Sequence, residues 1–218
     1  MKEHLYLFSG LGADERAFAK LDLNAFSVTH IKWIQPIVNE NIKAYATRLL
    51  PQITTANPIL VGLSFGGMMA VEVAKQIATK QIILIASAKG RKEIPFYFRW
   101  SGALGLYRFM PYSKMKKADA VSCFLFGAKT EEDKKLLAAI LADTDIDFLK
   151  WAIDKIVNWK NETMHPNLTH IHGTADQILP YRFVQCDYPI GGGGHLMTLN
   201  RAPEISALLA QIVEVEKS

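Results

Sequence analysis

Short apolar runs alternate with amphipathic stretches along most of the chain. The apolar runs are rich in β-branched residues and predict strands over residues 4–9, 27–33, 58–64, 81–87, 168–173 and 182–189. Apolar positions at helical spacing predict a short helix after Asp14 and longer helices over residues 39–53, 66–78 and 202–215. Strands that alternate with helices favour a mostly parallel sheet of about six strands, covered by helices on both faces.

The alternation stops between residues 89 and 163. This segment predicts helices over residues 100–112, 130–141 and 146–159, but it contains no convincing strand. A helical excursion between two strands of one sheet is best interpreted as a lid. We therefore expect an α/β core formed by residues 1–88 and 164–218, with residues 89–163 as a helical lid insertion.

Composition narrows the class of protein. The chain has 218 residues, half of them hydrophobic, which fits one globular domain with a proper core. No apolar run approaches the length of a membrane span, and the N-terminus lacks the apolar stretch of a secretion signal. Cys123 and Cys186 form no CxxC pair, so neither a zinc site nor a disulfide framework is expected. We expect a cytoplasmic protein without stable membrane insertion, cofactor or metal.

The most specific motif is Gly62-Leu63-Ser64-Phe65-Gly66. It follows the apolar strand PILV and precedes an amphipathic helix. A serine on so tight a strand-to-helix turn is exposed above the sheet, and the flanking glycines let the chain fold back. The helix N-terminus behind it favours negative charge. This pattern predicts that Ser64 is a nucleophile rather than a helix cap.

A serine nucleophile needs a base and a group that orients the base. His195 follows four glycines and precedes the last helix, which is an unusual place for a histidine that merely fills the core. Asp176 follows the end of a predicted strand through a short turn, where α/β sheets place their sites. We predict that His195 is the base and that Asp176 orients it.

With these three residues in the order Ser, Asp, His, the sequence resembles the α/β-hydrolase superfamily. The resemblance is carried by GLSFGG, HGTADQILP and GGGGHLM and covers the chain apart from the lid. It implies an oxyanion hole formed by the backbone N–H groups of Leu11 and Phe65. It also implies a minimal six-stranded sheet that lacks the two leading strands of the family. In some members the acid follows the strand before the lid, but Ala88 and Lys89 occupy that place here.

The lid sequence bears on the substrate. Aromatic residues are dense between positions 96 and 112, and between positions 89 and 117 there are eight Lys or Arg but one acid, Glu93. The aromatic side chains fit an apolar acyl pocket or packing on the core, and the basic run could attract an anionic substrate, a nucleic acid or a membrane surface. The candidate substrate contacts are Phe96, Arg99, Trp100 and Arg108.

We therefore expect hydrolysis of a small or medium carboxylic ester or thioester, with a small-molecule acyl substrate as the partner. One alternative keeps the triad but cleaves a carbon–carbon bond, or eliminates from a carboxylated substrate held by Arg99 or Arg108. Another is a catalytically silent ligand-binding protein on the same scaffold. Nucleic-acid binding is disfavoured, because no recognised motif accompanies the basic run.

Overall fold

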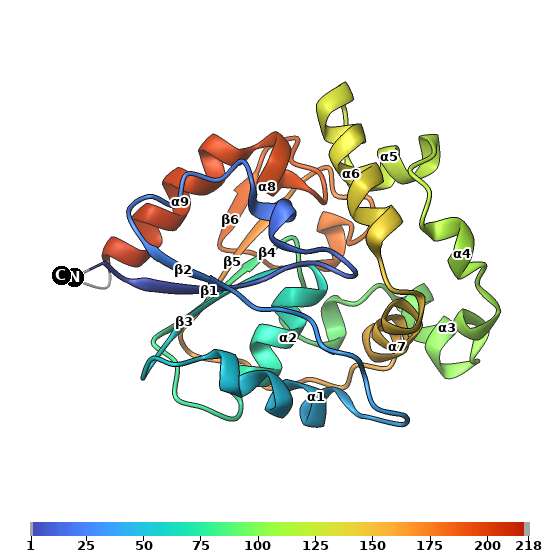
Figure 1. The fold of residues 1–218 in the computed structure, drawn as a ribbon, viewed down its shortest axis with the longest axis horizontal. Coiled ribbons are helices and arrows are strands. Elements are labelled where there is room, and N and C mark those ends of the chain that lie inside the picture. The colour runs from blue at the N-terminus through green and yellow to red at the C-terminus, as the bar shows by residue number, and fades with distance from the viewer. Residues whose placement is uncertain (1, 216–218) are drawn as a thin grey trace.

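A six-stranded parallel sheet forms the centre of the computed structural model, which describes residues 2–215 (Figure 1). The sheet has the strand order β2-β1-β3-β4-β5-β6, and every neighbouring pair is parallel. Its strands are β1 (His4–Phe8), β2 (Ser27–His30), β3 (Ile59–Leu63), β4 (Gln81–Ile85), β5 (Leu168–Gly173) and β6 (Tyr188–Ile190). The predicted α/β fold with about six strands is confirmed.

The last strand departs from its prediction. The sequence predicted a strand over residues 182–189, but β6 spans only Tyr188–Ile190, and a 3₁₀ turn, η5 (Tyr181–Phe183), takes up the beginning of the range. Pro180 starts this turn, and the Phe183 and Val184 amides donate to the carbonyls of Pro180 and Tyr181. The local turn therefore prevailed over the β-branched pattern.

The two faces of the sheet carry different halves of the core. Alternate strand residues such as Leu7 and Val61 pack against α9 (Ala202–Val215), which contributes Leu209 to the same cluster. The residues between them, such as Leu60, pack under α1 (Ile42–Leu49) and α2 (Phe65–Ala74). This period of two is what a sheet buried on both faces requires. Figure 1 shows α9 on one side of the sheet and α1 with α2 on the other.

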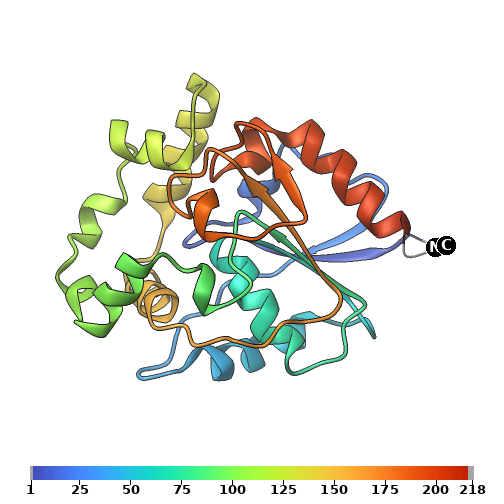
Figure 2. The same cartoon turned by 180° about the vertical axis from the view of Figure 1, so that it is seen from behind.

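The chain between β4 and β5 is helical, as predicted. It forms α3 (Phe96–Ala103), α4 (Tyr112–Met115), α5 (Ala120–Phe126), α6 (Glu131–Asp143) and α7 (Ile146–Val157). Both ribbon views show these helices gathered at one end of the sheet (Figures 1 and 2). We refer to residues 89–163 as the helical insertion.

One predicted helix of the insertion is wrong. Residues 100–112 do not form a single helix, because α3 ends at Ala103 and Gly105 adopts a left-handed φ of 68°. A 3₁₀ turn, η4 (Leu106–Phe109), follows. Glycine is the residue that takes this conformation without strain, so its position explains the break. The helix α5 was not predicted at all.

Within residues 2–215, no helix has both the length and the apolar character needed to cross a membrane.

Candidate active site

Ser64 stands on a strained turn between β3 and α2. Its φ of 54° and ψ of −123° lie outside the regions that L-residues normally adopt. Three hydrogen bonds hold this conformation: the Ser64 N–H donates to Ile85 O at 2.9 Å, and the Ser64 carbonyl accepts from Gly67 N at 2.9 Å and from Ser87 Oγ at 2.6 Å. These hydrogen bonds therefore hold Ser64 in its strained conformation.

The glycines of the motif are required by close packing. A Cβ on Gly66 would lie 2.2 Å from the carbonyl oxygen of Phe8 and 2.3 Å from that of Ser9, at the end of β1. A Cβ on Gly62 would lie 2.4 Å from the Cα of Gly67. These distances are shorter than any real Cβ contact, so the first turn of α2 can approach β1 and β3 only where no side chain intervenes.

His195 lies between Ser64 and Asp176. Its Nε2 is 2.7 Å from Ser64 Oγ and its Nδ1 is 2.8 Å from Asp176 Oδ2. A carboxylate can only accept, so Nδ1 carries the proton of the neutral ring, and Nε2 is left to accept from the Ser64 hydroxyl. His195 and Asp176 are buried, whereas Ser64 is partly exposed. The structure thus brings together the three residues predicted from separate parts of the sequence.

Asp176 is held as a carboxylate by its turn. Its Oδ1 accepts from the backbone N–H groups of Ile178 at 2.8 Å and Leu179 at 2.9 Å, which leaves Oδ2 to His195. Burial raises the pKa of Asp176, but the charge and hydrogen bond of His195 and the Leu179 amide outweigh it, so the net pKa lies below the usual value.

A second histidine supports this turn. His172, fully buried on β5, has its Nε2 at 2.8 Å from Leu179 O and 3.7 Å from Asp176 Oδ2. Because a carbonyl only accepts, Nε2 must be protonated, and the ring ties β5 to the residues that hold the carboxylate. Burial lowers the pKa of His172, so its neutral form is favoured. This contact could not be predicted from the sequence, because a histidine inside a strand does not reveal its partner.

The loop after β1 lies beside Ser64. A Cβ built on Gly10 would be 3.6 Å from Ser64 Cβ. Ser9 fixes the loop, because its buried Oγ donates to Ala13 O at 2.6 Å and accepts from Trp33 Nε1 at 3.0 Å. Within residues 2–215, the Leu11 N–H donates no hydrogen bond to the protein.

The Phe65 N–H is the first of α2, where helix amides have no intrahelical acceptor. Both amides predicted for the oxyanion hole therefore come from segments that adjoin the serine.

One insertion residue reaches the site and was missed from the sequence. Phe126, at the end of α5, has its ring centroid 5.9 Å from that of His195 in an edge arrangement. Its carbonyl accepts from Leu196 N at 3.0 Å. No signal in the sequence pointed to Phe126, because α5 itself was not predicted.

The four predicted substrate contacts lie on α3 and η4. Phe96 is 46% exposed and Trp100 66% exposed, and Arg108 is exposed with its guanidinium 5.7 Å from the Tyr107 ring centroid. Arg99 is half-buried, and its Nε is buried without a hydrogen-bond partner. Their role toward a substrate stays a prediction.

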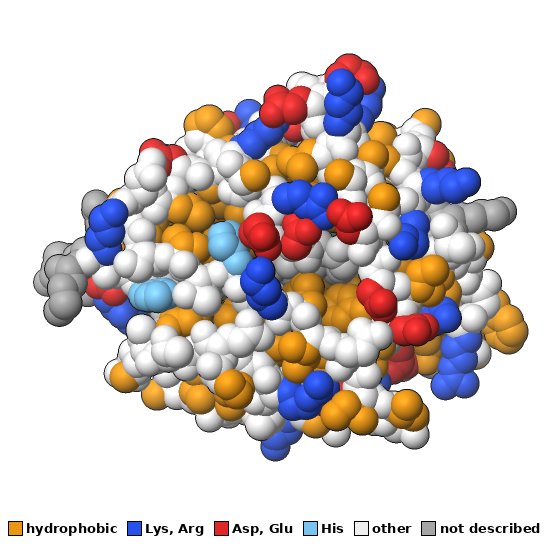
Figure 3. Space-filling model, in the orientation of Figure 1, with side chains coloured by type: hydrophobic (Ala, Val, Ile, Leu, Met, Phe, Trp, Pro, Cys, Tyr) orange, Lys and Arg blue, Asp and Glu red, His pale blue; other side chains and the backbone are white. Residues whose placement is uncertain are grey.

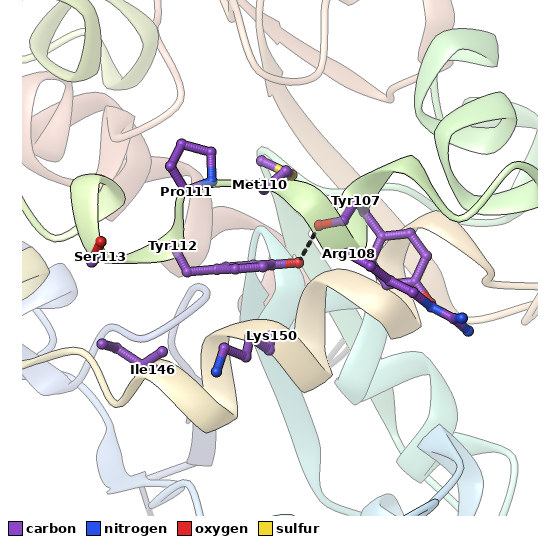
Figure 4. A pocket seen from close by; sticks show the side chains of 8 residues that line it. All are labelled: Tyr107, Arg108, Met110, Pro111, Tyr112, Ser113, Ile146 and Lys150. Carbon is purple, nitrogen blue, oxygen red and sulfur yellow. Dashed lines mark hydrogen bonds between the residues drawn. The ribbon is translucent and has the colours of Figure 1, made fainter.

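A cavity of about 580 Å³ lies within the insertion (Figure 4). Its lining includes Arg108 of η4, Tyr112, and Ile146 and Lys150 of α7. The Tyr112 hydroxyl donates to Tyr107 O at 2.6 Å across it, as Figure 4 shows. Both tyrosines belong to a small apolar cluster that also contacts Leu11, so this cluster joins the insertion to the loop beside Ser64.

No group of three or more His, Cys, Asp or Glu residues is placed to hold a metal ion in the described part of the chain.

The chain has the α/β-hydrolase fold. Solved structures align with nearly its whole length. A putative non-heme bromoperoxidase, BpoC, from Mycobacterium tuberculosis H37Rv has a TM-score of 0.70 at 15% identity, over 100% of this chain and 94% of that one. The enol-lactonase from Burkholderia xenovorans LB400 has a TM-score of 0.69 at 18% identity, over 98% and 92%.

An esterase from Exiguobacterium antarcticum has a TM-score of 0.69 at 13% identity, over 97% of this chain and 92% of that one. No protein-family model matches the sequence, and no curated protein shows significant similarity to it. At these identities the solved structures define the fold alone.

Proposed function

We propose that this protein is a serine hydrolase that cleaves a small or medium carboxylic ester or thioester through an acyl-enzyme on Ser64. The observation that carries the proposal is the continuous hydrogen-bonded chain from Ser64 Oγ through His195 to Asp176, at 2.7 and 2.8 Å. Nucleophilic acyl transfer needs three parts: a nucleophilic serine, a base whose Nε2 is unprotonated, and a carboxylate that fixes the tautomer of the base.

In the first half-reaction, Ser64 Oγ attacks the acyl carbon and His195 Nε2 takes the hydroxyl proton. The imidazolium that forms is stabilised by Asp176, which stays ionised because its pKa is low. The Leu11 and Phe65 N–H groups donate to the oxyanion, and each such donor contributes about 3 kcal/mol to transition-state stabilisation. The intermediate then collapses, the alcohol or thiol leaves with the proton from His195, and the acyl group remains on Ser64.

In the second half-reaction, His195 takes a proton from a water molecule that attacks the acyl-enzyme. Collapse of the second tetrahedral intermediate returns the proton to Ser64 Oγ and releases the carboxylic acid. The partial exposure of Ser64 gives water access to the acyl carbon.

The structural neighbours support an ester bond as the target. Their names include esterases, an enol-lactonase and an N-acyl homoserine lactonase, and a lactone is a cyclic ester. These activities are those of the neighbours. We propose for this chain only the kind of bond that they share, the ester bond.

A panel of p-nitrophenyl esters of increasing acyl length tests the proposal. We expect turnover by the wild type, loss of it in Ser64→Ala, and no change in Ser27→Ala, an exposed serine on β2. A fluorophosphonate probe should label the wild type and Ser27→Ala but not Ser64→Ala. Absence of both turnover and labelling in the wild type would favour the ligand-binding alternative.

A second candidate keeps the triad but acts on a carboxylated substrate, by carbon–carbon bond hydrolysis or elimination. The observation in its favour is that Arg108 and Lys150 both line the cavity of the insertion, where they could pair with a carboxylate. Loss of turnover of anionic substrates in Arg108→Ala, with p-nitrophenyl acetate turnover intact, would select it. If Arg108→Ala turned over both the anionic substrates and p-nitrophenyl acetate at wild-type rates, this second candidate would be excluded.

A further inference from the structure

The outer face of the insertion exposes large apolar side chains. On α3 and η4, Trp100 is 66% exposed, Leu104 71%, Leu106 54% and Phe109 86%. We call these four residues, with Phe96 and Tyr97, the outer apolar patch. Such a concentration of exposed aromatic and aliphatic groups marks an interaction surface rather than chance exposure.

The patch faces away from α7, although its Phe96 and Tyr97 rings also contact Phe183 of η5 at 6.2 and 6.0 Å. Phe96 and Trp100 are four residues apart and so share one side of α3, and Leu104, the C-cap of this helix, continues the same spacing. Gly102 lies on the opposite side, where an added Cβ would be 2.7 Å from Val157 O of α7. The inner side of α3 is therefore closed by α7, and the aromatic side remains open.

The patch is bordered by cations that have no protein carboxylate as partner. Arg91, Lys92 and Arg108 make no ion pair within the described part of the chain. The one acid in this stretch, Glu93, is buried and accepts from the backbone amides of Lys89 and Gln185. The segment between residues 89 and 117 thus carries an excess of positive charge. In Figure 3, apolar, basic and some acidic side chains lie next to one another in the right-hand part of the view, where Figure 1 places the insertion.

A cavity of about 640 Å³ adjoins the patch, with Lys89, Arg91 and Lys92 in its lining. Phe183, also in the lining, has its ring 6.2 Å from that of Phe96. Two acids line it as well: Glu93, which is already hydrogen-bonded, and the exposed Glu162. Three cations against one free carboxylate make this a suitable place for an anionic headgroup beside the apolar side chains.

We propose that the outer apolar patch and its bordering cations bind the surface of an anionic phospholipid membrane. Aromatic and leucine side chains would enter the headgroup region while the lysine and arginine side chains pair with lipid phosphates. A single-stranded nucleic acid would cover the aromatic rings by stacking but would leave Leu104 and Leu106 in water, so the lipid surface accounts for more of the patch. The binding is interfacial, and among the described residues no helix is able to cross the bilayer.

Co-sedimentation with phosphatidylcholine vesicles, with and without phosphatidylglycerol, tests the proposal. We expect partition onto the anionic vesicles only, weakened by salt. Each basic residue removed, as in Arg91→Ser or Lys92→Ser, should reduce the partition coefficient about fivefold. Trp100→Ser with Phe109→Ser should reduce it at least as much. Lys92, Trp100 and Phe109 are exposed, so the melting temperatures of their variants should not change. Arg91 is half-buried and donates to Trp159 O at 3.2 Å, so Lys92→Ser is the cleaner of the two charge variants.

The matched controls lie far from the insertion in sequence. Val38 is 87% exposed and Lys43 is exposed, so Val38→Ser and Lys43→Ser remove an apolar and a basic side chain elsewhere, and neither should alter binding. The assay is repeated with Ser64→Ala, which keeps binding independent of any hydrolytic activity. The proposal is overturned by equal binding to neutral vesicles, by equal losses in patch and control variants, by tighter binding to single-stranded RNA, or by a dimer that Phe109→Ser dissociates.

Discussion

Replacing Asp176 by Asn tests the role of the carboxylate without changing its shape. In the wild type, Oδ1 accepts from the Ile178 and Leu179 amides, and Oδ2 accepts from His195 Nδ1. An asparagine has a single carbonyl oxygen, which can face either the two backbone amides or His195. If the NH₂ group faced the two backbone amides, two buried donors would lose their acceptor, at about 1–3 kcal/mol each. The carbonyl oxygen will therefore face the turn, and the NH₂ group will face His195.

That orientation forces the wrong tautomer on the base. Nδ1 must then accept from the asparagine, so Nε2 carries the proton and cannot take the one on Ser64. We expect kcat for p-nitrophenyl acetate to fall about 10⁴-fold, or ~5 kcal/mol of activation free energy, which is the known effect of the same substitution in the serine-protease triad. Asp147→Asn, on an exposed carboxylate, should keep full activity.

The proposed role of Asp176 is wrong if Asp176→Asn, folded by circular dichroism and with a melting temperature near that of the wild type, retains kcat within tenfold. Crystals of the variant should show the amide nitrogen within hydrogen-bond distance of His195 Nδ1.

The other predictions concern stability. Gly66→Ala should cost about 1–3 kcal/mol in urea unfolding, because its Cβ would overlap the Phe8 carbonyl, whereas Gly191→Ala, with nothing within 4 Å, should be nearly neutral; equal losses would contradict this. Trp159→Phe removes the indole donor at 2.8 Å from Glu72 Oε1, which keeps the Lys75 ammonium at 2.6 Å, and should cost about 1 kcal/mol with kcat unchanged; an unchanged free energy of unfolding would show the bond to be dispensable. Burial lowers the pKa of His170 to about 3, so between that value and its ordinary 6.5 the unfolded chain binds one more proton. As the pH falls through this range, stability falls by about 1.4 kcal/mol per unit from this group, and His170→Leu should reduce the slope measured between pH 6 and pH 5 by that amount; an unchanged slope would show that His170 titrates normally.

The positions of Ser64, Asp176 and His195 could be predicted because each lies on a segment with a strong local signal. Gly62 and Gly66 beside Ser64, and Gly193 and Gly194 before His195, lie in close backbone packing. A Cβ on Gly193 would lie 3.2 Å from the Cα of Gly173, and one on Gly194 would lie 3.1 Å from the Cα of Gly127. Such constraints act over a few residues and are visible in the sequence. Buried strands were equally clear, since β3 and β4 are buried along their whole length.

The features that the sequence did not predict depend on contacts between distant segments. The ring of Phe126 meets His195 because α5 packs on the histidine loop, and the His172 side chain meets Leu179 O because the turn folds back over β5. The break after Ala103 was visible in principle as Gly105, but the helix predicted over residues 100–112 ran through this glycine. Tertiary packing and one left-handed glycine decided these cases.

The junction between α5 and the histidine loop limits how this protein can be re-engineered. A Cβ on Gly194 would lie 3.1 Å from the Cα of Gly127, Leu196 N donates to Phe126 O, and Asn200 Nδ2 donates to Gly127 O at 2.8 Å. The insertion therefore cannot be exchanged as an independent unit. A chimera that replaces its helices with those of another scaffold must retain residues 126–128, because the loop that carries the imidazole packs against them.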